Sequence, residues 1–264
     1  MRYQTISLVQ RDAIAYLELQ RPEQENRVEG HLLRELAAAC EALADDPQVG
    51  VVVISGGEGA AFSLGWDASL LAASARGGEG EAAGRGGERL GHTFDFLAQM
   101  PRPVICAING DALSAGLELA LACDVRLACP EARFAFPEVA WGLIPMAGGT
   151  QRLARIVGRA AALELILTAE PIDAQTALRI GLVSRVVPRD RLLVEASALA
   201  ERIAACGPIA VRYAKEAVSQ GLDMSLEQAL RFETDLTIIL QTTEDRAEGV
   251  RAFLEKRAPE FHGR

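Results

Sequence analysis

Hydrophobic and polar residues alternate near the start of the chain and give way to longer apolar runs further along. Residues 3–9 and 13–19 alternate as half-buried strands do, so we expect them to form a hairpin through residues 10–12. The runs 49–55 and 103–108 are almost continuously apolar, which is typical of parallel strands that are covered on both faces. This pattern predicts an α/β fold with a mainly parallel sheet.

The predicted helices are concentrated in the last third of the chain. Apolar residues recur at helical spacing in residues 29–44 and 88–100, and residues 124–128 predict one more short strand. From about residue 159 onward the predicted helices cover 159–168, 173–180, 189–205, 208–219, 225–240 and 243–256, with a strand-like stretch at 182–187. Helices that follow a complete α/β core must bury their apolar faces against another surface, and another subunit is the natural candidate.

The charge balance narrows the function classes. The 264 residues carry a formal net charge of −9, which argues against general binding to nucleic acid or to anionic membranes. No apolar run approaches the roughly 18 residues that span a bilayer. The N-terminus also lacks the apolar region of a signal peptide, so we expect a cytoplasmic protein.

Cysteine and histidine residues offer little chemistry. The five cysteines are odd in number and none are spaced as CxxC, so we expect reduced, buried thiols at Cys40, Cys106, Cys123, Cys129 and Cys206. The three histidines, His31, His92 and His262, are far apart in the sequence. This spacing argues against a zinc site and against a Ser-His-Asp triad.

One glycine-rich segment, residues 75–91, contains almost no apolar residues. It matches neither a GxxxxGK pattern nor a GxGxxG turn that opens a helix after a strand, so it does not indicate a phosphate-binding loop. Two interpretations stay open, a mobile lid near an active site and a solvated linker.

Two carboxylates stand out because almost everything around them is apolar. Glu118 lies in SAGLELALAC, and Glu138 lies in FAFPEVAWG. A charged carboxylate in such surroundings is costly to bury unless it is paired or has a raised pKa. Two carboxyl groups with raised pKa values suit general acid–base catalysis near neutral pH. The plainer interpretation is that each glutamate faces solvent or pairs with Arg126 or Arg133.

Two loops follow buried strands. One consists of small residues and leads into the helix that contains Glu118. Ser114, Ala115 and Gly116 lie between a buried strand and the helix that contains Glu118, and the loop 61–67 follows the other buried strand in the same way. The first N–H groups of a helix have no intrahelical acceptor and carry partial positive charge. Backbone N–H groups from the two loops could therefore point at one carbonyl oxygen and form an oxyanion hole.

Three long segments match known motifs in order and with consistent spacing. They are AAFSLGWD against AFxAGxD, PVICAINGDALSAGLELALACDVRLA against KPVIAAVNGxAxGGGxELAxxCDxxxA, and FAFPEVAWGLIPMAGGTQRLARIVG against FxxPExxxGxxPxxGGTQRLxRxxG. These motifs belong to the crotonase superfamily, the enoyl-CoA hydratase/isomerase family. The chain resembles that family over essentially its whole length, which is far more specific than any single short motif.

The resemblance implies an architecture and a ligand. The fold would be an α/β crotonase-like spiral of repeated ββα units in residues 1–200. A helical region at 201–264 would build homotrimers, often paired into hexamers, and would cover coenzyme A. The substrate would be an acyl-CoA thioester, so coenzyme A is part of the substrate and neither a metal nor a redox cofactor is required.

The resemblance also implies roles for single residues. Glu118 and Glu138 match the two catalytic glutamates of the enoyl-CoA hydratases, and the backbone N–H groups of Trp66 and Ala115 match the two oxyanion-hole donors. The implied coenzyme A contacts are Arg27, Ser63, Leu64, Gly65 and Asp67, joined by Phe253 and Lys256 from a neighbouring subunit. The implied reaction is reversible syn addition of water to a trans-2-enoyl-CoA thioester.

Departures from the motifs bear on the acyl group rather than on the reaction class. Ala115 stands where the family usually has glycine, Trp66 replaces a small residue, and Arg27 replaces a usual alanine. The acyl preference is expected to depend on Trp66, Leu70, Leu71, Phe94, Trp141 and Ile144. Double-bond isomerases, hydrolases, decarboxylases and ring-forming synthases use the same scaffold, although many lack one of the two glutamates. An idle scaffold and an RNA-binding relative are further alternatives, and the acidic charge argues against RNA.

Overall fold

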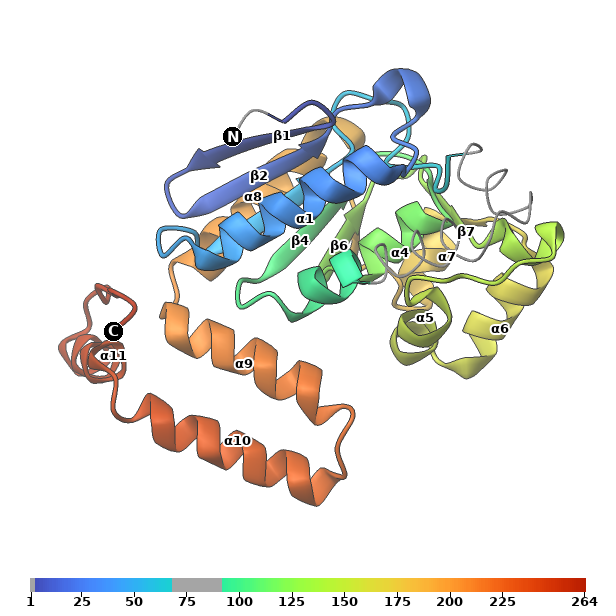
Figure 1. The fold of residues 1–264 in the computed structure, drawn as a ribbon. Coiled ribbons are helices and arrows are strands. Elements are labelled where there is room, and N and C mark those ends of the chain that lie inside the picture. Colours follow the sequence, from blue (N-terminus) through green and yellow to red (C-terminus); the bar gives the residue numbers. More distant parts are fainter. Residues whose placement is uncertain (1–2, 68–91) are drawn as a thin grey trace.

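The computed structural model describes residues 3–67 and 92–264, which form an α/β core and a layer of C-terminal helices (Figure 1). In this part of the chain, six strands form the main sheet in the order β1-β2-β3-β4-β6-β9. Three further strands form a second, smaller sheet in the order β5-β7-β8. This architecture confirms the expected fold class.

The main sheet begins with a hairpin and continues in parallel. β1 (Ile6–Arg11) pairs antiparallel with β2 (Ile14–Leu19). The parallel part then runs through β3 (Val51–Ser55), β4 (Val104–Ile108), β6 (Val125–Ala128) and β9 (Arg185–Val186). Every residue of β3 and β4 is buried, which explains their unbroken apolar sequence. These are the strands that the hydrophobic pattern predicted, with ends that differ by a few residues.

Helices cover the main sheet on both sides. In Figure 1, α1 (Gly30–Asp45) crosses in front of the sheet and α8 (Arg189–Ala204) passes behind it, where it packs against β3 and β4. Residues 92–99 are helical, which agrees with the described part of the helix expected at 88–100. A short 3-10 helix, η1 (Pro22–Gln24), follows β2 and precedes the loop that leads to α1.

The second sheet was not predicted from the sequence. Its strands β5 (Ala112–Leu113), β7 (Arg133–Ala135) and β8 (Ile172–Asp173) are too short to show an alternating pattern. The elements around it are α4 (Ala115–Leu121), η2 (Pro137–Trp141), α5 (Gly149–Val157), α6 (Arg159–Thr168) and α7 (Ala174–Arg179). Because β5 and β7 pair in parallel, the turns that lead from them into α4 and η2 lie side by side.

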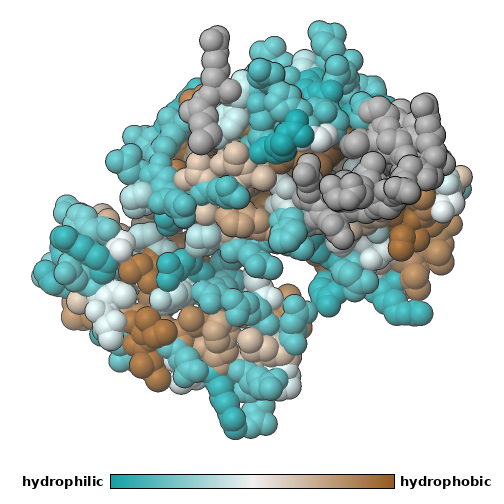
Figure 2. Space-filling model, in the orientation of Figure 1, coloured by the Kyte–Doolittle hydropathy of each residue, from teal (hydrophilic) through white to brown (hydrophobic). Residues whose placement is uncertain are grey.

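The C-terminal helices form a layer that extends away from the core. α9 (Pro208–Gly221) and α10 (Leu226–Leu240) pack against each other, and α11 (Glu244–Glu255) follows at the far end (Figure 1). Within this described region, α9 has no buried residue and α10 has only Leu236. Figure 2 shows apolar surface on this layer. Among the described helices, none has the length and apolar character to cross a membrane.

One prediction about the cysteines was wrong. Cys40, Cys106, Cys123 and Cys129 are buried free thiols, as expected, but Cys206 is exposed. It lies between α8 and α9, where the chain leaves the core, so the apolar residues next to it in sequence do not cover it.

Candidate active site

Glu118 is buried in α4, and backbone N–H groups at and just before the start of α5 hold one of its carboxylate oxygens. Oε1 accepts hydrogen bonds from the N–H groups of Ala147 at 2.7 Å and Gly149 at 2.9 Å. Oε2 is also buried, and within the described part of the chain it has no hydrogen-bond partner. Burial raises the pKa of Glu118 to about 7, and the nearby charge of Glu138 adds to the rise, although the two N–H donors oppose it. This carboxyl group can therefore give or take a proton near neutral pH.

Glu138 is the second residue of η2 (Pro137–Trp141), and its exposed fraction is nearly as small as that of Glu118. Its Oε1 accepts a hydrogen bond of 2.5 Å from the hydroxyl of Ser114, the residue that precedes α4. Its Oε2 is buried and, like that of Glu118, unpartnered among the described residues. Burial raises the pKa of Glu138, whereas the Ser114 hydroxyl and the backbone N–H of Glu138 lower it.

Neither arginine that was considered as a partner neutralises these glutamates. Arg126 donates to the carbonyl oxygens of Leu182 and Cys123, and Arg133 pairs with Asp111 at 2.9 Å. The exposed fractions of Glu118 and Glu138 are 0% and 1%. The interpretation of solvent-facing or simply ion-paired glutamates is therefore wrong. In the described residues, no group of three or more His, Cys, Asp and Glu side chains is arranged to hold a metal ion.

The loops that follow β3 and β5 pack directly on each other. Ser63 forms a parallel bridge to β5. A Cβ atom at Gly65, where φ is +84°, would lie 2.8 Å from Oγ of Ser114. A Cβ atom at Gly116 would lie 2.7 Å from the Cβ of Ser63. Only glycine fits at these two crossing points, because any side chain would push the loops apart.

The backbone N–H groups of Trp66 and Ala115 lie on these two loops. The N–H of Val28 donates to the carbonyl of Gly65 at 2.6 Å, and the N–H of Asp67 donates to the carbonyl of Val28 at 3.0 Å. This parallel bridge directs the N–H of Trp66 away from Val28. Ala115 is the first residue of α4, where an N–H has no intrahelical acceptor. Among the described residues, no backbone acceptor pairs with either N–H.

The loop around Asn26 crosses over the loop that carries the predicted coenzyme A contacts. The hydroxyl of Ser63 donates to the carbonyl of Asn26 at 2.8 Å, and the N–H of Leu64 donates to the carbonyl of Glu25 at 3.1 Å. The buried side-chain amide of Asn26 donates to the carbonyl of Phe62 at 3.0 Å. The structure therefore brings the predicted residues of the two loops together.

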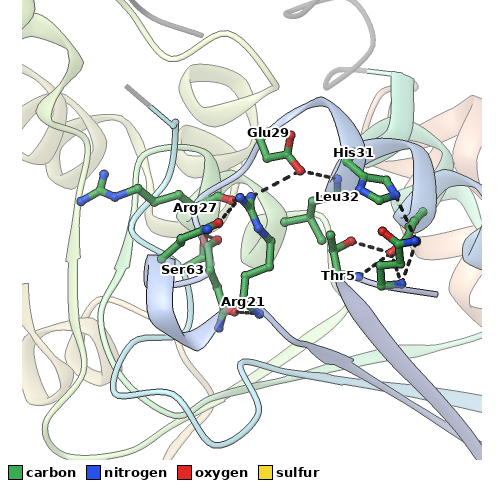
Figure 3. Close-up of polar contacts among 11 residues, drawn as sticks. Thr5, Arg21, Arg27, Glu29, His31, Leu32 and Ser63 are labelled. Atoms are coloured by element: carbon green, nitrogen blue, oxygen red, sulfur yellow. Dashed lines mark hydrogen bonds and ion pairs between the residues drawn. The ribbon is translucent and has the colours of Figure 1, made fainter. Parts of the chain in front are cut away.

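Arg21 holds the loop around Asn26 in place, and the Arg27 side chain in that loop stays exposed to solvent. Nη1 of Arg21 donates to the carbonyl of Arg27 at 2.8 Å and pairs with Glu29 at 3.5 Å (Figure 3). In Figure 3 the guanidinium of Arg27 points away from that pair. It pairs with Glu25 at 3.2 Å, and its side chain is 36% exposed, so it remains open to an anionic ligand.

Phe253 and Lys256 are not brought to this site within one chain. They lie at the end of α11, far from α4 (Figure 1). The Phe253 side chain is highly exposed, at 82%. Their separation from Glu118 is what a contribution to a neighbouring chain requires.

The residues expected to shape an acyl pocket fall into three sets: two buried, two exposed and two outside the described residues. Trp66 and Phe94 are buried, and the indole N–H of Trp66 has no hydrogen-bond partner among the described residues. Trp141 and Ile144 are exposed. Leu70, Leu71 and the glycine-rich segment 75–91 lie outside the described residues.

The groups that hold the two carboxylates were not predicted from the sequence. The backbone of Ala147 and Gly149 holds Glu118, and a Cβ atom at Gly149 would lie 2.9 Å from Oε1 of Glu118. Arg152 supports that loop by donating to the carbonyl of Ala147 at 2.8 Å. The paired glycines of AGGT could have indicated a close backbone approach. Nothing in the sequence pointed from Ser114 to its partner.

Comparison with known proteins shows which family the chain resembles. A family model described as enoyl-CoA hydratase/isomerase matches residues 10–264. The chain is 41% identical to the 2,3-dehydroadipyl-CoA hydratase of Escherichia coli, over 95% of this chain and 96% of that protein. It is 38% identical to the crotonyl-CoA hydratase of Syntrophomonas wolfei, over 99% of both chains. The crystal structure of an enoyl-CoA hydratase from Bacillus anthracis superposes with a TM-score of 0.92 at 40% identity, covering 99% of this chain and 100% of the other.

Proposed function

Because the chain belongs to the enoyl-CoA hydratase/isomerase family, we propose that its two buried glutamates catalyse reversible syn addition of water to a trans-2-enoyl-CoA thioester. The chain is an enzyme of the enoyl-CoA hydratase type. The observation that carries the proposed mechanism is a shared arrangement at Glu118 and Glu138. Each carboxyl group is buried with one oxygen held by the protein, and Oε2 of each has no partner in the described residues. We infer that the two unpartnered oxygens hold one water molecule between them.

The two glutamates divide the proton transfers. Glu118 orients the water and accepts its proton as the oxygen bonds to C3, and Glu138 exchanges a proton with C2. A pKa near 7 for Glu118, which results from its burial, suits a group that must take and return a proton in both directions. Microscopic reversibility then lets the same pair remove water from a 3-hydroxyacyl-CoA.

The N–H groups of Trp66 and Ala115 would bind the thioester oxygen. Negative charge grows on that oxygen as the enolate-like transition state forms, so these donors act more strongly on the transition state than on the substrate. A single donor of this kind contributes about 3 kcal/mol in other oxyanion holes. The unpaired N–H groups on two loops in direct contact support this assignment.

Coenzyme A would lie along the crossing of the two loops. One loop would contact coenzyme A through Ser63, Leu64, Gly65 and Asp67. From the other loop, Arg27 would reach a phosphate of coenzyme A. Phe253 and Lys256 would come from a neighbouring subunit in a homotrimer or a dimer of trimers. In this division, residues 1–200 carry the chemistry and residues 201–264 carry assembly and part of the coenzyme A contact.

Replacing each glutamate by glutamine tests the mechanism. Glu118→Gln and Glu138→Gln should each lower kcat for hydration by about a hundredfold or more, because general acid–base work is lost while the side-chain shape is kept. The measurement is the loss of enoyl-thioester absorbance on the best substrate of a trans-2-enoyl-CoA panel that begins with crotonyl-CoA.

Binding of butyryl-CoA, a saturated analogue, serves as the control and should change little in both variants. Near wild-type turnover by either variant on that substrate would rule out the two-glutamate mechanism. Transfer of the double bond from a trans-3-enoyl-CoA without any hydration would assign the isomerase reaction instead.

A further inference from the structure

We propose that Ser114 is a positioning residue that holds the Glu138 carboxylate in the orientation required for proton exchange at the substrate carbon. The inference rests on the proposed hydration, since Ser114 has this task only if Glu138 exchanges a proton with C2. Ser114 does not touch the reacting atoms and acts through Glu138.

The geometry gives Ser114 control over one oxygen of Glu138. The Ser114 side chain is completely buried, and its hydroxyl donates to Oε1 of Glu138 over 2.5 Å. A hydroxyl–carboxylate bond of this length belongs to the strong, charge-assisted class. Oε2 of Glu138 is the oxygen without a partner in the described residues. The hydroxyl thus determines which oxygen is left to face the substrate.

The Ser114 hydroxyl does not cap its helix, although serine at an N-cap position usually does. Ser114 is the N-cap residue of α4, where a serine oxygen ordinarily accepts a hydrogen bond from an N–H of the first helical turn. No side-chain capping bond forms in the described α4. The hydroxyl donates to Glu138 instead of accepting from its own helix.

The backbone at Ser114 is costly for any residue with a side chain. Its φ of 52° and ψ of −128° lie in a region that glycine adopts easily and serine does not. The absence of a side chain at Gly65 provides the space for the Ser114 side chain, because a Cβ atom at Gly65 would lie 2.8 Å from Oγ of Ser114. A side chain that is kept in a strained, enclosed position is best explained by the bond that its hydroxyl makes.

Two substitutions separate the hydroxyl from the backbone strain. Ser114→Ala keeps the Cβ atom and removes the hydroxyl, whereas Ser114→Gly also relieves the unfavourable φ. Both should lower kcat for crotonyl-CoA hydration by about tenfold or more, the scale for loss of a hydrogen bond to a charged group. KM and the affinity for butyryl-CoA should change little, because the substrate contacts remain.

The pH profile gives a second readout that a structural role would not move. In dehydration of 3-hydroxybutyryl-CoA, Glu138 must be ionised to remove the C2 proton. The Ser114 hydrogen bond lowers the pKa of Glu138, so both variants should shift the acidic limb of kcat/KM to higher pH. Stability should follow a different order, with Ser114→Gly melting above Ser114→Ala.

The outcomes distinguish this inference from the proposed function. In a Glu138→Gln background, adding Ser114→Ala should cost little more activity, whereas in a Glu118→Gln background it should still shift the remaining rate. Ser55→Ala removes another buried hydroxyl and is the matched control with unchanged kinetics. If Glu138→Gln is inactive but Ser114→Ala and Ser114→Gly keep wild-type rates and pH profiles, the positioning role is wrong and the hydration mechanism stands. Activity that is lost in Ser114→Ala and recovered in Ser114→Gly would show that Ser114 serves the fold alone.

Discussion

At the scale of single residues, Glu118 couples the chemistry of the site to the stability of the ligand-free fold. Burial raises the pKa of Glu118 to about 7 in the folded protein, from a reference value of 4.5. Between those pH values the unfolded chain binds fewer protons than the folded one at this position. The contribution of Glu118 to the free energy of unfolding therefore falls as pH rises from about 4.5 to above 7.

Glu118→Gln should accordingly stabilise the protein more at pH 8 than at pH 5. The glutamine removes the titration, so its advantage should grow by about 1 to 3 kcal/mol between the two conditions. Urea unfolding of both proteins at both pH values measures the difference. An equal effect of the substitution at pH 5 and pH 8 would mean that Glu118 titrates normally in the folded protein.

At the residue scale, the sequence indicates the surroundings of the two glutamates but not the groups that hold them. The apolar neighbours of Glu118 and Glu138 indicated burial in a special environment as one of two interpretations, and the structure bears that one out. The hydrogen-bond partners of the two carboxylates could not be predicted from the sequence. Ser114 and Glu138 are brought together only by the pairing of β5 with β7, and those strands are too short to leave a pattern in the sequence.

At the scale of elements, the site depends on two loops that cross where Gly65 faces Ser114 and Gly116 faces Ser63. Gly65 and Gly116 allow the loop after β3 to touch the start of α4. This contact fixes the spacing between the N–H groups of Trp66 and Ala115. The long apolar strands and the helices could be predicted from the sequence. The crossing of the two loops could not, because it depends on the second sheet.

Gly65→Ala should reduce kcat much more than it reduces butyryl-CoA affinity. The new Cβ would force the loops apart and misplace an oxyanion donor, which acts mainly on the transition state. Gly158→Ala is the matched control, because its φ of +79° carries a similar backbone cost but no atom lies within 4 Å of its Cβ position. Hydration kinetics and thermal melting of both variants make the comparison. A loss of stability in both with full activity in Gly65→Ala would contradict the role of the crossing.

At the scale of the whole molecule, the C-terminal layer exposes apolar side chains that a single chain does not cover. Leu222, Leu226 and Phe253 are 73%, 75% and 82% exposed. Large apolar side chains that are exposed on several helices of one layer favour association with another chain. The sequence predicted these helices well, because each is long and periodic, but it could not show that they extend from the core.

Deleting residues 250–264 should weaken coenzyme A binding and loosen the oligomer while leaving the main sheet folded. The deletion removes Phe253 and Lys256 together with the end of α11, which lies away from the core. Sedimentation and butyryl-CoA titration measure the two effects, and the Phe253→Ala and Lys256→Ala variants separate ligand contact from assembly. A full-length chain that sediments as a stable monomer would contradict the shared site.

The distance between α11 and the glutamates has a genetic consequence. If each tail completes the pocket of the next chain, a defective tail harms its neighbour and leaves its own glutamates intact. A mixed assembly of chains with damaged tails and chains with damaged glutamates then contains some complete pockets. Two alleles that are each inactive alone should therefore restore part of the activity when they are expressed together.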